Sequence, residues 1–313
     1  MKFKRLVKLF LLVPFLFSNT ALADEQSAAS LLKKVVAGLN NNSYKATAVY
    51  IRPSGMEAID IEYSKGFERI TSSNDSELQV IHTNGDEIKI YSANRSKQKH
   101  KGKIRFQPLK FFQAHQSRGL KSYQLFISKG YHQVAGRQSV RLSIISNTND
   151  RYSYIYWVDL ESQIILRHDV LDENGELIER MVFTSLSLNE IKSDESTHKI
   201  DIAELKTLKY NYAKKSISQA PVIGWLPPEF SLHSIESIAK ANNKGSYERI
   251  IYTDGFAFIE IFTAEVGHEA RMTRGQQLDA FHVYKGVSKT HTFTVEGQMP
   301  YGVLKKVGSN FQL

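Results

Sequence analysis

The feature of this sequence that most restricts its fold is an alternation of apolar and polar side chains, interrupted by turns. Between Trp157 and Phe183 the chain reads WVDLESQIILRHDVLDENGELIERMVF, and the alternation breaks at LESQ and at DENG. A period of two is typical of strands with one dry face and one wet face. Asn174-Gly175 is a dipeptide that supplies the positive φ angles of a tight hairpin. The stretch therefore predicts antiparallel strands, whose apolar face covers either a packed core or a lipid.

The same pattern predicts a large antiparallel sheet over most of the chain's first two thirds. A helix is expected before it at Ala28–Leu39, ending at Asn40-Asn41-Asn42, and a short helix is expected within it at Pro108–Ser117. A sheet of about ten strands curls rather than staying flat. Helices across its open side would leave an apolar hollow of the kind in which ligands bind. The expected strands are 44–51, 57–63, 67–71, 77–82, 87–91, 123–128, 134–145, 152–159, 163–171 and 176–188.

A second, smaller unit is predicted from Trp225-Leu226-Pro227-Pro228 onward, because the pattern is lost over 189–224 and then resumes. Asp254-Gly255 is expected to form a two-residue hairpin turn and Lys285-Gly286 another turn. The fold class is therefore α+β and mainly antiparallel β. We expect a large domain at 24–210, a linker at 211–224 and a small C-terminal domain at 225–313. The small domain should contain strands 230–235, 247–253, 256–263, 280–284 and 291–296, with a closing helix at 300–307.

The first 23 residues resemble a secretory signal peptide. Four cations precede the apolar run Leu9–Phe17, and Ala21-Leu22-Ala23 is a small-residue cleavage site. The alternative is a transmembrane anchor, but the apolar run is too short to span a bilayer. There is no Cys, which excludes disulfides, thiol nucleophiles, Cys-based zinc sites and a lipoprotein signal. The prediction is a soluble periplasmic protein.

Positive charge is concentrated in one part of the chain. The formal net charge is +9, and without the four leader cations 37 Lys and Arg stand against 32 Asp and Glu. Residues 88–149 contain 13 Lys and Arg and no carboxylate. This region is either a solvated face balanced by acidic neighbours or a surface for anions such as lipid phosphates or an acidic partner. The second interpretation makes Lys97, Lys99, Lys101, Lys103 and Arg105 candidate binding residues, with no nucleic acid expected as a partner.

No motif in the sequence predicts catalysis, a cofactor or a metal. His268-Glu269 begins like the zinc signature HExxH, but Met272 stands where the second His is required. Neither a GxSxG elbow nor a glycine-rich phosphate loop occurs. A dispersed site stays open as an alternative, since catalytic groups are brought together in space. We predict a protein that is not an enzyme.

Aromatic residues alternate along one expected strand, where Tyr152, Tyr154 and Tyr156 share a face and Trp157 lies on the other. They form either an ordinary sheet core or the lining of an acyl-chain cavity, since aromatics are common in strands.

Several segments together resemble one protein family. They are Asp150-Arg151-Tyr152-Ser153-Tyr154, Trp157-Val158-Asp159, the run from Leu171 to Glu179, Ala135-Gly136-Arg137, Phe67-Glu68-Arg69-Ile70, Gly224-Trp225-Leu226-Pro227 and Tyr252-Thr253-Asp254-Gly255-Phe256-Ala257. In this order, over both expected domains, they resemble the MucB/RseB family of sigma-factor regulatory proteins. The chain departs from the family after Ile70, where a Gly-Pro-Arg-Glu turn is missing, and at Pro228-Glu229-Phe230.

The resemblance implies a large domain similar to periplasmic lipoprotein carriers, an unclosed barrel covered by helices, joined to a smaller sheet domain. It implies a negative regulator of the envelope-stress sigma factor, which binds the periplasmic segment of a membrane-anchored anti-sigma factor and shields it from proteolysis. Lipid or lipopolysaccharide would release that partner. A lipid or lipoprotein carrier is the alternative, and a homo-oligomer is compatible with either. Tyr154, Trp157, Trp225, Asp254 and Phe256 complete the candidate ligand- or partner-binding residues.

Overall fold

The computed structural model describes two large antiparallel sheets, a separate two-stranded pair and two α-helices. It covers residues 19–64, 67–72, 77–84, 87–94, 119–189, 212–214, 222–239, 246–265, 276–288 and 291–312. The predicted short helix at 108–117 and the cationic candidates Lys97, Lys99, Lys101, Lys103 and Arg105 lie outside these residues. The fold class is confirmed, with mainly antiparallel strands in two sheet regions and a helix near residue 300.

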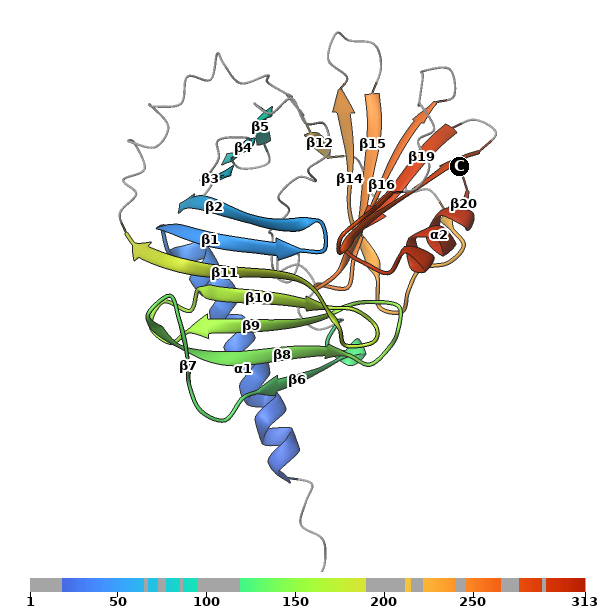
Figure 1. Cartoon of the computed structure of the whole chain (residues 1–313). Coiled ribbons are helices and arrows are strands. Elements are labelled where there is room, and N and C mark those ends of the chain that lie inside the picture. The colour runs from blue at the N-terminus through green and yellow to red at the C-terminus, as the bar shows by residue number, and fades with distance from the viewer. Residues whose placement is uncertain are drawn as a thin grey trace, which may run out of the picture.

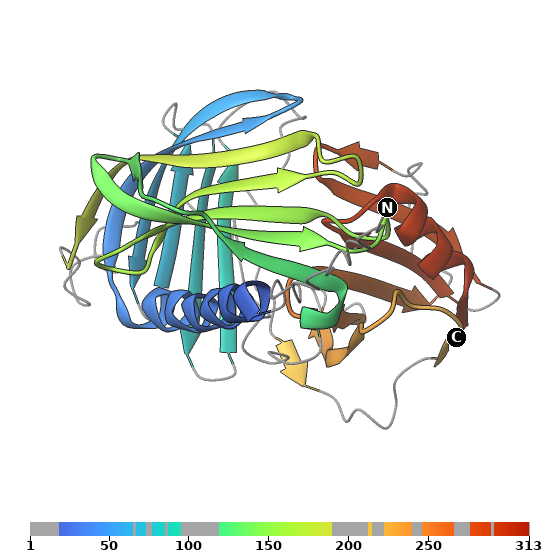
Figure 2. The ribbon, with the colours of Figure 1, turned by 90° about the horizontal axis from the view of Figure 1, so that it is seen from below.

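The first sheet is long, curved and open (Figures 1 and 2). Its strand order is β5-β4-β3-β2-β1-β11-β10-β9-β8-β6, with β7 paired to β8. In the described part of the chain the two edge strands, β5 and β6, do not pair, so the barrel is unclosed. Its elements are α1 (Asn19–Asn41), β1 (Tyr44–Arg52), β2 (Gly55–Ser64), β3 (Phe67–Ser72), β4 (Glu77–Asn84), β5 (Glu87–Asn94), a 3-10 turn η2 (Gly119–Ser122), β6 (Tyr123–Ile127), β7 (His132–Val134), β8 (Arg137–Ser146), β9 (Ser153–Asp159), β10 (Ile165–Leu171) and β11 (Leu177–Leu188).

Helix α1 lies on the concave side of this sheet (Figure 2). Three apolar residues of the predicted helix, Leu32, Val35 and Val36, are buried against β6, β8, β9 and β10. Burial of each such side chain contributes roughly 1.5–3 kcal/mol, so α1 is held by packing. The helix starts at Asn19, before the predicted cleavage site at Ala23, and that site stays a prediction.

The second sheet has the order β12-β14-β15-β16-β19-β18-β17, and α2 packs on one face (Figure 1). A short pair, β13 with β20, lies beside it. Strands β12 and β13 fall within the predicted linker 211–224, and the domain boundaries stay a prediction. The elements are β12 (Tyr212–Lys214), β13 (Val222–Ile223), β14 (Ser231–Ala239), β15 (Ser246–Thr253), β16 (Phe258–Glu265), β17 (Gln276–Leu278), β18 (Phe281–Val287), β19 (His291–Gly297), α2 (Tyr301–Ser309) and β20 (Phe311–Gln312).

Helix α2 and strand β18 each contain a glycine that faces an aromatic ring. A Cβ on Gly308 of α2 would overlap the ring of Tyr284, and one on Gly286 would overlap the ring of Phe293. The predicted turn at Lys285-Gly286 is wrong, because both residues lie inside β18. There the glycine leaves space for the ring of Phe293 on the neighbouring strand.

Two other turn predictions need correction. The single strand expected at 134–145 is divided into β7 and β8 by a two-residue turn, in which Ala135 and Gly136 have φ angles of 50° and 70°. Positive φ at both positions is what such a hairpin requires. The Asp254 hairpin is longer than expected, since Thr253 pairs with Phe258 and leaves four residues in the turn.

Candidate functional site

The contact surface between the two sheet units, which we call the interdomain interface, holds buried charged residues that the sequence did not predict as a site. Arg151, just before β9, is 0% exposed and donates from Nη1 to Oδ2 of Asp254 at 2.7 Å. Its Nη2 donates to the carbonyl of Pro228 at 2.9 Å, and its Nε donates to Asp150 at 2.7 Å. The guanidinium also lies 5.7 Å from the ring centroid of Tyr123. One side chain of the first unit is thus bonded to two segments of the second.

Asp254 is fully buried as well, yet its carboxylate is surrounded by donors. Oδ1 accepts from the backbone N–H groups of Phe256 and Ala257 at 2.9 and 2.8 Å, which is why the turn is four residues long. Oδ2 accepts from Arg151 and from the hydroxyl of Tyr123 at 3.3 Å. Burial raises the pKa of Asp254, while Arg151 and the two amides oppose that rise. We call Tyr123, Arg151, Asp254 and Phe256 the Asp254 cluster.

A second group of side chains lies elsewhere in the interface, around Glu179 of β11. Glu179 is 5% exposed and hydrogen-bonded to the Tyr50 hydroxyl, and it accepts from Nε2 of Gln298 at 3.4 Å. Asp279 of the second unit accepts from the Ser54 N–H and hydroxyl at 2.9 and 2.7 Å. We call Tyr50, Arg52, Glu179, Asp279 and Gln298 the Glu179 cluster.

Charge is less well balanced in the Glu179 cluster. Arg52 lies 3.2 Å from Glu57 and 3.7 Å from Asp279, so its charge is shared between these two carboxylates. Among the described residues the Glu179 carboxyl has no ion-pair partner within 4.0 Å. Burial raises the pKa of Glu179 to about 7, opposed by Tyr50 and Arg52 and reinforced by Asp279.

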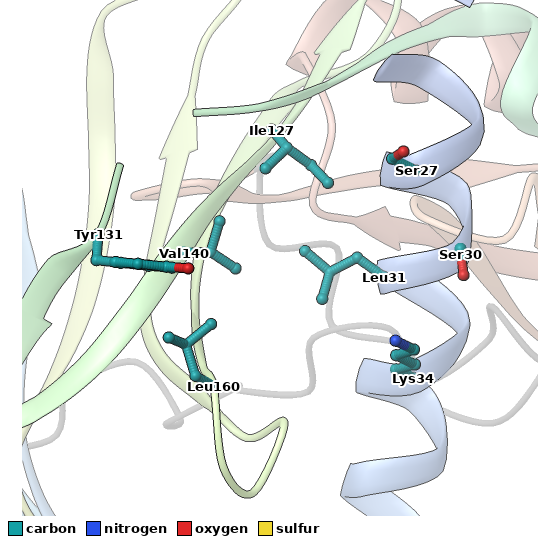
Figure 3. Close-up of a pocket in the computed structure, with 8 residues that line it drawn as sticks. All are labelled: Ser27, Ser30, Leu31, Lys34, Ile127, Tyr131, Val140 and Leu160. Atoms are coloured by element: carbon teal, nitrogen blue, oxygen red, sulfur yellow. The ribbon is translucent and has the colours of Figure 1, made fainter. Parts of the chain in front are cut away.

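A pocket opens between α1 and the strand ends of the first sheet, as Figure 3 shows. Its volume is about 590 Å³, within the range of small-molecule sites. Leu31 points from α1 toward Val140 and Leu160 (Figure 3). Tyr131 and Leu160 at its rim are 69% and 38% exposed, and Lys34 supplies a cation. The remaining lining residues are Ser27, Ser30 and Ile127.

The structure brings three of the predicted binding residues together. Tyr154 and Phe256 both lie near Tyr123, with ring centroids 6.5 and 4.8 Å from its ring, and Asp254 accepts a hydrogen bond from its hydroxyl. All three predicted residues are buried, so in this arrangement they contact the chain itself.

The two tryptophans lie apart from this group. Trp157 is on the opposite face of the first sheet, with the Arg167 guanidinium 3.9 Å from its ring centroid. Trp225 belongs to the second unit, where Lys306 Nζ lies 3.8 Å from its ring centroid. A role of any of these residues in binding stays a prediction.

The tyrosine face of β9 belongs to the core in the structure. Tyr152, Tyr154 and Tyr156 pack with α1, β6 and β8, and none of them lines the pocket. Open space is found instead at the flank of α1. Arg151, Tyr123 and Glu179 were missed as site residues, although Arg151 and Glu179 stand in the segments that carry the family resemblance.

In the part of the chain that the structure describes, no helix combines the length and hydropathy needed to cross a bilayer. The same residues contain no group of three or more His, Asp or Glu side chains placed to hold a metal.

Comparison with known proteins gives matches over both units. The family described as MucB/RseB N-terminal domain matches residues 27–208, and that described as MucB/RseB C-terminal domain matches residues 218–312. The sigma-E factor regulatory protein RseB of Haemophilus influenzae is 23% identical over 297 residues, covering 93% of each chain. RseB of Escherichia coli K12 is 24% identical over 305 residues, covering 95% of this chain and 94% of its own. The structure of the Pseudomonas aeruginosa MucA/MucB complex has a chain similar in fold, with a TM-score of 0.60, 20% identity and coverage of 91% and 98%.

Proposed function

This chain belongs to the MucB/RseB family, and on that premise we propose that it is a non-enzymatic periplasmic regulator of the envelope-stress sigma factor. The observation that carries the proposal is the match of both units in the same order, over almost the whole chain. Relatives that share this arrangement are named sigma-E factor regulatory proteins. A related chain of the same fold has been solved as a MucA/MucB complex.

Its partner would be the periplasmic segment of a membrane-anchored anti-sigma factor. Binding of that segment would shield it from the protease that starts its destruction, and so keep the sigma factor inactive. The absence of a catalytic motif in the sequence fits this role, because shielding requires only a stable complex.

An amphiphile would release the partner, and the pocket beside α1 is the site we propose for its apolar chain. Leu31, Ile127 and Val140 supply apolar surface, and Lys34 could pair with an anionic head group. Release requires that the ligand bind the free regulator better than the complex. A tenfold preference needs only about 1.4 kcal/mol, which burial of about two methylenes at roughly 0.8 kcal/mol each would supply.

The test is co-purification of the full mature chain with an anti-sigma factor's periplasmic segment, with and without added lipopolysaccharide. We expect a stable complex that lipopolysaccharide dissociates. Failure to retain the segment at micromolar concentration would rule out the regulator.

A matched pair of variants tests the pocket. Leu160→Asp places a carboxylate at the exposed rim, so it should weaken release by lipopolysaccharide at least tenfold while leaving the complex intact. Gln133→Asp adds the same charge at another exposed position of the first unit and should release normally. If lipopolysaccharide releases the segment equally well from both variants, the pocket is not the site of the releasing ligand.

The second candidate, a lipid or lipoprotein carrier, is favoured by the open curved sheet with a pocket at its rim. A carrier would accelerate transfer of a labelled lipid between vesicles, with repeated turnover. A regulator would bind lipid stoichiometrically without that acceleration.

A further inference from the structure

Glu179 is a buried acid at a contact between two units. It stands on β11 of the first sheet and accepts a hydrogen bond from Gln298, which follows β19 of the second. Its side chain is almost entirely removed from solvent. A neutral carboxyl tolerates such a site far better than an ionised one, since an ionised group loses its hydration there.

The groups around Glu179 offset only part of this cost. Asp279 faces it from the second unit, and Arg52 of β1 is the nearby cation. Arg52 already contacts both Glu57 and Asp279. Tyr50 bonds Glu179 from β1, and Tyr152 of the first unit lies near Glu179 as well as Asp172 and Glu173. One cation and one carboxylate therefore act on Glu179, and that cation, Arg52, is shared with Glu57 and Asp279.

We infer that Glu179 is a proton-sensitive contact of the interdomain interface. Its neutral form is tolerated at the closed contact, whereas its ionised form loses its hydration there, faces Asp279 and weakens the contact between the units. The arrangement of the units would then respond to pH without any ligand. This inference goes beyond the proposed function, because it concerns the chain by itself.

The pH at which the interface should respond follows from the burial of Glu179. Removal from solvent raises the pKa of Glu179 to about 7, so its charge changes near neutrality, well above the ordinary range of a carboxyl. The Asp254 cluster is not expected to respond there, because Arg151 stays charged and pairs with Asp254 at every pH used.

The experiment measures the distance between the units as a function of pH. The chain has no Cys, so Gln133→Cys and Lys305→Cys, both at exposed positions, give one fluorophore on each unit of the full mature chain. Energy transfer should fall as pH rises from 5.5 to 8.5, with a midpoint near 7. In Glu179→Gln, which is neutral at every pH, transfer should stay at the low-pH value.

Two further variants keep the test decisive. Glu161→Gln removes an 80% exposed carboxylate of the same unit and should keep the wild-type profile. Asp279→Asn removes the facing charge and should move the midpoint to lower pH, which serves if Glu179→Gln does not fold. A wild-type profile that is flat, or that Glu179→Gln and Asp279→Asn leave unchanged, would overturn the inference. Neither the partner nor a lipid is present, so this result is independent of the proposed function.

Discussion

The Asp254 cluster and the Glu179 cluster use the same interface in opposite ways. Both place a carboxyl of less than about a tenth exposure between the two units. Asp254 has an arginine, a tyrosine hydroxyl and two backbone amides around it. Glu179 has a tyrosine and an amide, and the nearest arginine is shared with other carboxylates. A buried charge whose donors are complete acts as a fixed structural contact, and one whose donors are incomplete can gain or lose its proton.

The largest effect should come from breaking the ion pair. Arg151→Ala leaves the Asp254 carboxylate buried without its cation, and we expect a loss of roughly 3–5 kcal/mol in the free energy of unfolding. Urea denaturation at pH 7 would measure it. Replacing both partners, as Arg151→Met with Asp254→Leu, should recover part of that loss, since no charge is then left buried. Arg141→Ala, at an exposed position, should change stability by less than about 0.5 kcal/mol. A loss below about 1 kcal/mol in Arg151→Ala would contradict this account.

The pH dependence of stability should separate the two clusters. The pKa of Glu179 is raised from 4.5 to about 7 in the folded chain. A raised folded-state pKa contributes stability that is complete below about pH 4.5 and is lost as pH rises through 7, on the order of 3 kcal/mol. Denaturation between pH 5 and 8.5 should show this decline in wild type and a smaller decline in Glu179→Gln. Parallel curves for the two proteins would argue against a titrating Glu179.

A smaller effect should follow from removing one donor of the Asp254 cluster. Tyr123→Phe keeps the ring that packs on Phe256 but loses the hydroxyl that donates to Asp254. Because the other donors remain, we expect a loss of about 1 kcal/mol in urea denaturation. Tyr131→Phe, in an exposed residue, is the control and should be neutral.

The smallest effect is expected at the rim of the Glu179 cluster. Ser54→Ala removes the hydroxyl that donates to Asp279 at 2.7 Å, in an exposed part of the interface. Water replaces such a donor readily, so the free energy of unfolding should fall by less than about 0.5 kcal/mol. A loss above 1 kcal/mol, measured in the same way, would mean that this rim is as closely packed as the Asp254 cluster.

Local patterns in the sequence predicted the strands well, because alternation and turn residues act over a few neighbours. The strand at Phe67, expected to end at Thr71, ends at Ser72. Gly286 shows where this fails. A glycine next to a lysine suggested a turn. In the structure this glycine instead leaves space for the ring of Phe293 on the neighbouring strand, which the local sequence does not indicate.

The interface could not be predicted in the same way. Arg151 and Asp254 are 103 residues apart, and nothing near either one indicates its partner. Glu179 shares a strand face with Met181 and Phe183, and nothing in the sequence indicates that Asp279 and Gln298 of the second unit lie beside it. The sequence predicted Asp254 and Phe256 as binding residues. In the structure both are buried, and they contact other residues of the same chain.

The close contact between Gly308 of α2 and the ring of Tyr284 also restricts how the sequence can evolve. A larger residue at position 308 would overlap the ring of Tyr284. Substitutions at positions 308 and 284 should therefore depend on each other. A screen for second-site revertants of Gly308→Ala should return smaller residues at 284. Positions 286 and 293 should behave as a second such couple.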